Sequence, residues 1–133
     1  MNETTYEGVV SALLVGAYEN DRGLVRDVFR KSGWRLYEAR DGHGVLGRVK
    51  RRPVQVVIAE SGGWQRLLQD LLDLPSPPQL VVTSRTADDI LWSEVLNHGG
   101  YDVLPQPLDR DELERVVAAA GRQFQSAGRS AAA

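Results

Sequence analysis

The sequence predicts an open α/β sandwich, in which helices cover both faces of a parallel β-sheet. Short apolar runs alternate along the chain with segments whose apolar residues recur at helical spacing. The runs are almost continuously apolar, which is typical of strands that are buried on both faces of a sheet. Because parallel strands are joined by right-handed helical crossovers, the alternation indicates five strands and five covering helices in one layered domain.

Each element follows from its local pattern. The first helix has Leu24, Val25, Val28 and Phe29 at helical spacing and a glycine stop, and the "PSPP" segment ends the third. The fourth helix has an acidic first turn and a glycine stop, and Asp109 is the expected N-cap of the fifth. The predicted strands span residues 9–16, 34–39, 54–60, 79–84 and 101–107. The predicted helices span residues 19–33, 42–52, 64–74, 87–100 and 109–124.

Composition restricts the classes of function. The 133 residues are 42% hydrophobic, which suits one domain, expected over residues 9–125 with disordered tails at 1–8 and 126–133. A formal net charge of -2 gives no positive field for nucleic acid. The absence of cysteine excludes disulfides and thiolate chemistry, and two histidines leave little for zinc. No apolar run suggests a signal peptide or a membrane span, so we expect a cytoplasmic protein without nucleic-acid or membrane partners.

The loops at the carboxyl ends of the strands are where a parallel α/β sheet places functional groups. Here they read "GAYEND", "ESGG", "TSRTADD" and "PQPLD". None contains an activated nucleophile, a base–nucleophile pair or a phosphate-binding glycine loop, so we do not expect an enzyme.

The loops and the element order resemble the receiver domain of bacterial response regulators, the family of the chemotaxis protein CheY. The resemblance covers about residues 10–125 and rests on "VVTSR" and "GGYDVLPQPLDRDEL", where Pro107 and Asp109 are similar to the family's Lys-Pro-Phe-Asp signature. It implies a flavodoxin-like three-layer sandwich with strand order 2-1-3-4-5 and the first and fifth helices on one face. It also implies a role in two-component, phosphorelay signal transduction.

The family's phosphorylation chemistry is incomplete in this sequence. The acidic pair that holds Mg²⁺ in the family falls at Gly16 and Ala17, which offer no side-chain ligand, so we expect no metal and no other cofactor. Glu60 stands at the phosphoacceptor position, one methylene longer than aspartate. The bridging lysine is replaced by Gln106, which cannot neutralise an anion.

Other parts of the family pattern are kept. Thr83 matches the switch hydroxyl, and Pro107 retains the place of a cis peptide. Glu60 is interpreted either as a built-in mimic of the phosphorylated state or as a strand-end carboxylate without function. Glu19 and Asp21 are too late in the chain for the acidic pair, and the helix dipole explains them at least as well as a rebuilt metal site.

The output face of the family is built by the fourth helix, the fifth strand and the fifth helix. The rotating aromatic residue of the family corresponds to Val103, which has no comparable switch, and we expect Tyr101 on the same side of the strand. Trp92 lies at helical spacing from Val95 and Leu96, which favours packing in the core over partner contact.

A basic ridge runs along the first helix, where Arg22, Arg26 and Arg30 recur every four residues beside Lys31. A solvated face balanced by Glu19 and Asp27 is the favoured interpretation, and docking of an acidic partner is the alternative.

The sequence therefore predicts a non-catalytic pseudo-receiver that stands alone and regulates through protein–protein contacts, with a histidine kinase, an output protein or a second copy as its partner. Two alternatives remain open at this point. One is a phosphorelay receiver that is phosphorylated at a non-standard acid. The other is a small flavodoxin-like domain that binds a ligand.

Overall fold

The computed structural model describes residues 9–17 and 19–132, with side chains as far as residue 128. Strands and helices alternate along the chain. The strands are β1 (Ser11–Val15), β2 (Arg35–Ala39), β3 (Val56–Glu60), β4 (Gln79–Ser84) and β5 (Asp102–Pro105). The helices are α2 (Glu19–Ser32), α3 (Val45–Arg51), α4 (Trp64–Leu72), α5 (Asp89–Asn97) and α6 (Arg110–Ala132). No helix in this part of the chain is long and apolar enough to cross a membrane.

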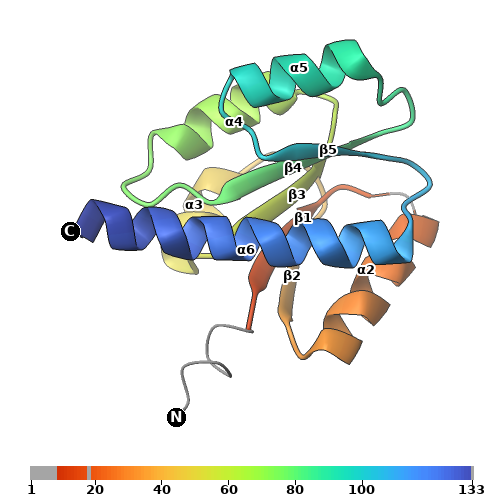
Figure 1. The fold of residues 1–133 in the computed structure, drawn as a ribbon, viewed down its shortest axis with the longest axis horizontal. Coiled ribbons are helices and arrows are strands. Elements are labelled where there is room, and N and C mark those ends of the chain that lie inside the picture. The colour runs from red at the N-terminus through yellow and green to blue at the C-terminus, as the bar shows by residue number, and fades with distance from the viewer. Residues whose placement is uncertain (1–8, 18, 133) are drawn as a thin grey trace.

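The predicted sheet topology is confirmed. The strands form one sheet in the order β2-β1-β3-β4-β5, and every neighbouring pair is parallel. Helices cover both faces, with α2 and α6 on one side and α3, α4 and α5 on the other (Figure 1). The order reverses between β1 and β3, which is the place where such sheets hold their functional groups.

Alternation along the central strands gives each face of the sheet its own core. Val56 and Ile58 of β3 pack with α2 and α6, whereas Val57 and Ala59 pack with the helices of the other face. All four side chains are buried. Since successive residues of a strand point to opposite faces, a run of apolar residues is what two cores require.

The carboxyl-terminal segment differs from the expectation. Helix α6 continues to Ala132, whereas we predicted disorder from residue 126. The segment 126–132 is rich in alanine, which forms helices without losing side-chain entropy, so its composition favours continuation of the helix. The other expected tail, residues 1–8, lies outside the described residues.

The prediction that Tyr101 shares a side with Val103 is wrong. Tyr101 packs against the core of α2 and α6, whereas Val103 belongs to the core of the opposite face. Tyr101 precedes the first residue of β5, and its N–H donates to the carbonyl of Leu80, 2.7 Å away. The strict alternation of a strand therefore does not extend back to it.

The basic ridge of α2 is paired with carboxylates, as the favoured interpretation required. Arg22 contacts Glu19 at 2.9 Å, and Arg30 and Lys31 both contact Asp27. Arg26 binds a carboxylate on a different element, because its Nε and Nη2 donate to Glu38 of β2 at 2.7 and 2.8 Å. These pairs leave the ridge little charge with which to attract an acidic partner.

The bidentate pair between Arg26 and Glu38 should make stability depend on pH. Hydrogen bonding from Arg26 holds the pKa of Glu38 below its ordinary value. A lowered carboxyl pKa stabilises the fold above the pKa of the unfolded chain, and this contribution disappears as the pH falls through the folded value. Glu38→Gln should therefore lower the melting temperature at neutral pH, and the difference from wild type should vanish between about pH 5 and about pH 2.

The matched control is Glu114→Gln, because Glu114 is an exposed glutamate without an ion pair to any described residue. Thermal unfolding followed by circular dichroism across the pH range compares the two variants. A deficit of Glu38→Gln that persists unchanged in acid would contradict the ion-pair explanation.

Candidate functional site

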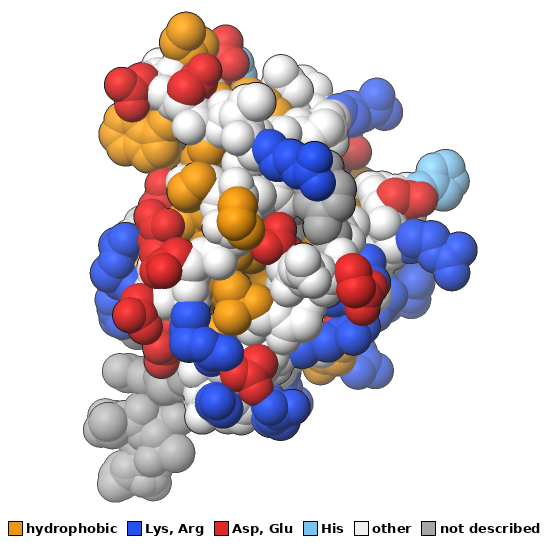
Figure 2. All heavy atoms as spheres, turned by 90° about the vertical axis from the view of Figure 1, so that its right-hand side faces the viewer, with side chains coloured by type: hydrophobic (Ala, Val, Ile, Leu, Met, Phe, Trp, Pro, Cys, Tyr) orange, Lys and Arg blue, Asp and Glu red, His pale blue; other side chains and the backbone are white. Residues whose placement is uncertain are grey.

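The candidate site lies at the edge of the sheet where the strands end. Glu60 is the last residue of β3 and pairs in register with Thr83 of β4. Figure 2 views the molecule from this side and shows acidic side chains along the left-hand edge, with hydrophobic ones beside them at the upper left. The site therefore combines residues from strands that are adjacent in space but distant in sequence.

A single amide joins two carboxylates at this edge. Nε2 of Gln106, just after β5, donates to Oε2 of Glu60 at 2.9 Å and to Oδ2 of Asp21 at 3.0 Å. An amide nitrogen carries two hydrogens, so one is available for each carboxylate. Glutamine thus satisfies both acids without contributing a positive charge. We call the three side chains Asp21, Gln106 and Glu60 the amide bridge.

Asp21 also holds the loop that leads into α6. It is only 5% exposed, although it lies in the first turn of α2, and its Oδ1 accepts the N–H of Leu108 at 3.1 Å. The Gln106–Pro107 peptide in this loop is cis, as expected. The expected N-cap is also present, because Oδ2 of Asp109 accepts the N–H of Glu112 at 2.9 Å. Sequence reasoning placed Asp21 on the helix dipole and missed both of its distant partners.

The backbone at the end of β1 is shaped for glycine. Gly16 has a φ of 53°, and a β-carbon on it would lie 3.2 Å from the carbonyl oxygen of Arg40. An aspartate would be strained there by its conformation and crowded by that carbonyl. Ala17 packs against the core of α2 and α6. In the described part of the chain, no three His, Cys, Asp or Glu side chains gather as a metal site would require.

Comparison with known proteins identifies the fold. No protein-family model matches the sequence, and no curated protein matches it. A response regulator of Thermotoga maritima is similar in structure, with a TM-score of 0.74 and 16% identity over 86% of this chain and 98% of that one. A chemotaxis response regulator of Vibrio cholerae is similar with a TM-score of 0.69 and 16% identity over 81% and 98%. The chain has the fold of a response-regulator receiver domain.

A third similar structure allows a contrast within this receiver fold. The receiver domain of a sensor histidine kinase of Pseudomonas aeruginosa carries a magnesium ion in its active-site cleft, and it matches with a TM-score of 0.72 and 16% identity over 84% and 97%. In the present chain, Gly16 and Ala17 stand where the acidic pair is expected. The hollow that Gly16 and Glu60 line also includes Asp41 and Arg40, so a hard cation there would meet two carboxylates from different segments of the chain and one positive side chain.

Hydroxyl groups surround the end of β4. Ser84 Oγ is 3.3 Å from Ser61 Oγ and 3.2 Å from Thr86 Oγ1, and it also accepts the N–H of Thr86 at 3.1 Å. Thr83 is buried beside Glu60, but the side-chain hydrogen bond of Glu60 goes to Gln106. The coupling of Glu60 to Thr83 that the sequence suggested therefore stays a prediction.

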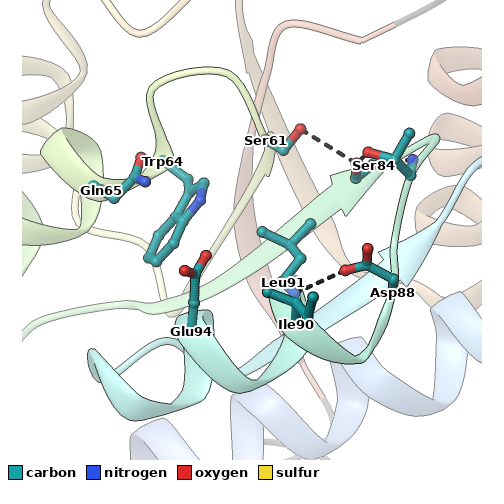
Figure 3. A pocket seen from close by; sticks show the side chains of 9 residues that line it. Ser61, Trp64, Gln65, Ser84, Asp88, Ile90, Leu91 and Glu94 are labelled. Carbon is teal, nitrogen blue, oxygen red and sulfur yellow. Dashed lines mark hydrogen bonds between the residues drawn. The ribbon is translucent and has the colours of Figure 1, made fainter.

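A groove of about 320 Å³ separates α4 from α5 next to these hydroxyls. Figure 3 shows Ser61 and Ser84 at one end, the indole of Trp64 along one wall, and Glu94 of α5 facing it. Asp88 caps α5 at the rim, where its carboxylate accepts the N–H of Leu91 at 2.9 Å. The groove therefore presents hydroxyls, carboxylates and one aromatic wall.

The expectation that Trp92 packs in the core is wrong. Trp92 is 47% exposed, and its indole N–H donates to Asp102 of β5 at 3.1 Å. Ile90 is 70% exposed on the same helix. Only Val95 is buried among the residues of α5, so spacing alone could not tell the inner face from the outer one. Trp92 therefore lies beside β5, whereas Ile90 lines the groove between α4 and α5.

Proposed function

We propose that this protein is a non-catalytic signalling module, a pseudo-receiver that acts by binding another protein. Its partner is a histidine kinase, an output protein of the same pathway, or a second copy of the chain. Regulation comes from contact through the α5–β5–α6 face, and no phosphoryl group is transferred to Glu60.

The observation that supports this proposal is the amide bridge. The carboxylate at the phosphoacceptor position is already bound by Gln106, which also binds Asp21. Phosphoryl transfer depends on cations that neutralise the developing charge. In this chain, Gln106 stands in place of the lysine, and Gly16 and Ala17 stand in place of the acidic pair that would bind a metal ion. The site therefore keeps the shape of a receiver without the charges that its chemistry uses.

The exposed surface of α5 supports a binding role. Ile90 and Trp92 offer apolar area, and the acidic groups Asp88, Asp89 and Glu94 lie on or beside the same helix. Large exposed apolar side chains with a polar surround are typical of protein contacts, and tryptophan is enriched at their centres. A partner that combines apolar side chains with basic groups would fit this helix.

Incubation with a small phosphodonor and Mg²⁺, followed by intact mass measurement, tests the proposal. We expect no phosphoryl adduct on the wild-type chain, because no cation site gathers the phosphoryl oxygens. The matched control is the triple variant Ala17→Asp, Glu60→Asp and Gln106→Lys, which restores one metal ligand, the shorter acceptor and the cation while leaving Gly16 intact. We expect this variant to show some adduct.

A stoichiometric adduct on the wild-type chain, lost in Glu60→Gln, would overturn the proposal in favour of a phosphorelay receiver with a non-standard acceptor. An adduct that survives Glu60→Gln would place the acceptor elsewhere and would equally contradict the proposal.

A further inference from the structure

A second hollow lies on the opposite side of the molecule from α5, at the edge strand β2. It has a volume of about 550 Å³ and is lined by Tyr37 of β2 and by Arg48, Arg51 and Arg52 at the end of α3. Tyr37 packs its inner side against the core, so its ring is held in place by the sheet. The lining is thus one fixed aromatic ring and three guanidinium groups.

These arginines lack the ion pairs that several other arginines form. Arg48, Arg51 and Arg52 form no ion pair with any residue that the structure describes. Six other arginines are matched by carboxylates within 4.0 Å, and these are Arg22, Arg26, Arg30, Arg66, Arg110 and Arg115. Three like charges around one hollow repel one another, which an anion in the hollow would relieve.

The helix dipole explains only part of this cluster. Cations at the end of a helix are favourable, but α3 has seven residues, and Arg52 lies beyond its last turn. The carbon Cζ of Arg52 lies over the ring of Tyr37, 5.1 Å from its centroid. Hydrogen bonding from the Arg52 side chain lowers the pKa of the Tyr37 phenol, with a further contribution from Arg35, consistent with positive charge around the ring.

We propose that the hollow formed by Tyr37, Arg48, Arg51 and Arg52 binds a free nucleotide that carries at least two negative charges. Guanidinium groups are planar and bind phosphate oxygens through paired hydrogen bonds, so Arg48 and Arg51 would hold the phosphates. The guanidinium plane of Arg52, which lies on the ring of Tyr37, is a flat surface on which a base can stack.

Size and charge favour a small ligand over a polymer. A hollow of about 550 Å³ lies within the range of cofactor sites, roughly 300–1,000 Å³. A nucleic acid strand would need cations along its path, whereas the chain as a whole carries a net charge of -2. The cations of this edge are instead concentrated between residues 35 and 52.

Isothermal titration of the full chain at low ionic strength tests the proposal, with ADP, inorganic pyrophosphate and adenosine as probes. We expect ADP to bind, pyrophosphate to bind more weakly, and adenosine not to bind. Arg48→Gln combined with Arg51→Gln should lower the affinity for both anions about tenfold or more. Tyr37→Val should weaken the binding of ADP but leave the binding of pyrophosphate unchanged, because only ADP has a base that stacks.

The matched control is Arg66→Gln, an exposed arginine on α4 that is paired with Asp70, and it should bind ADP like wild type. Circular dichroism checks that each variant is folded. The proposal is overturned if neither ADP nor pyrophosphate gives a saturable heat of binding. It is also overturned if Arg66→Gln loses as much affinity for ADP as the double arginine variant. Binding of a single-stranded oligonucleotide or of anionic phospholipid vesicles without binding of ADP would also overturn it.

Discussion

Replacing Asp21 with alanine should lower the free energy of unfolding by about 1.5–3 kcal/mol, the usual contribution of a hydrogen bond to a charged group. The change removes the acceptor for Leu108 N–H and one of the two acceptors for the Gln106 amide. Denaturant unfolding measures the loss. Amide hydrogen exchange in the variant should also be faster in the loop of Gln106 and Leu108 than in the sheet.

Glu19→Ala is the matched control, because Glu19 shares the first turn of α2 but is exposed and contacts only Arg22. Any benefit from the helix dipole is common to both acids. Glu19→Ala should therefore reduce stability much less. Equal losses in the two variants would mean that Asp21 acts through the dipole, as the sequence alone suggested, and that its two distant hydrogen bonds contribute little.

Glu60→Gln should weaken self-association about tenfold, the effect of removing one charge-assisted hydrogen bond, while the fold stays intact. The substitution keeps the length of the side chain and removes the charge by which a mimic of the phosphorylated state would hold the β4–α5 region in its binding arrangement. Sedimentation equilibrium of the wild type and the variant over a range of concentrations measures the change.

Two further variants separate the routes by which Glu60 could act. Thr83→Val tests the neighbouring strand, and Gln106→Leu removes the amide that binds Glu60 in the structure. If Glu60 acts through one of these two residues, combining Glu60→Gln with the substitution at that residue should weaken self-association no further than either single substitution. If association is unchanged in Glu60→Gln and stability rises, Glu60 is only a strand-end charge and the mimic is rejected.

Features that depend on a short stretch of chain were predictable from the sequence. Glu60 follows a run of apolar residues, and β3 ends there. Asp109 begins a helix with a pattern typical of N-caps, and the proline after Gln106 carries the cis peptide. Each of these depends on neighbours within a few residues, so the local pattern contains the needed information.

Asp21 could not be assigned in this way. Its hydrogen-bonding partners lie 85 and 87 residues away in the chain, and only the packing of α2 beside the end of β5 brings them together. In the sequence it is one of two acids at the start of a helix. The combination of an early acid with a glutamine in the lysine position is the signal that could have suggested the pairing.

Trp92 shows the opposite difficulty, since its local pattern was clear but misleading. The spacing to Val95 and Leu96 is correct for a helix, yet of these three residues only Val95 is buried. An apolar residue on a short helix can belong to a binding surface as easily as to the interior. The sequence gives no measure of how much of α5 the rest of the fold covers.

The amide bridge has a consequence for how such a module could be controlled. A phosphorylated receiver is reset when its phosphoryl group is hydrolysed, so its output follows the ratio of kinase to phosphatase activity. The bridge between Gln106 and its two acids contains no group that can be added or removed in this way. Occupancy of a partner would then follow mass action, so the concentration of the protein itself would set the signal.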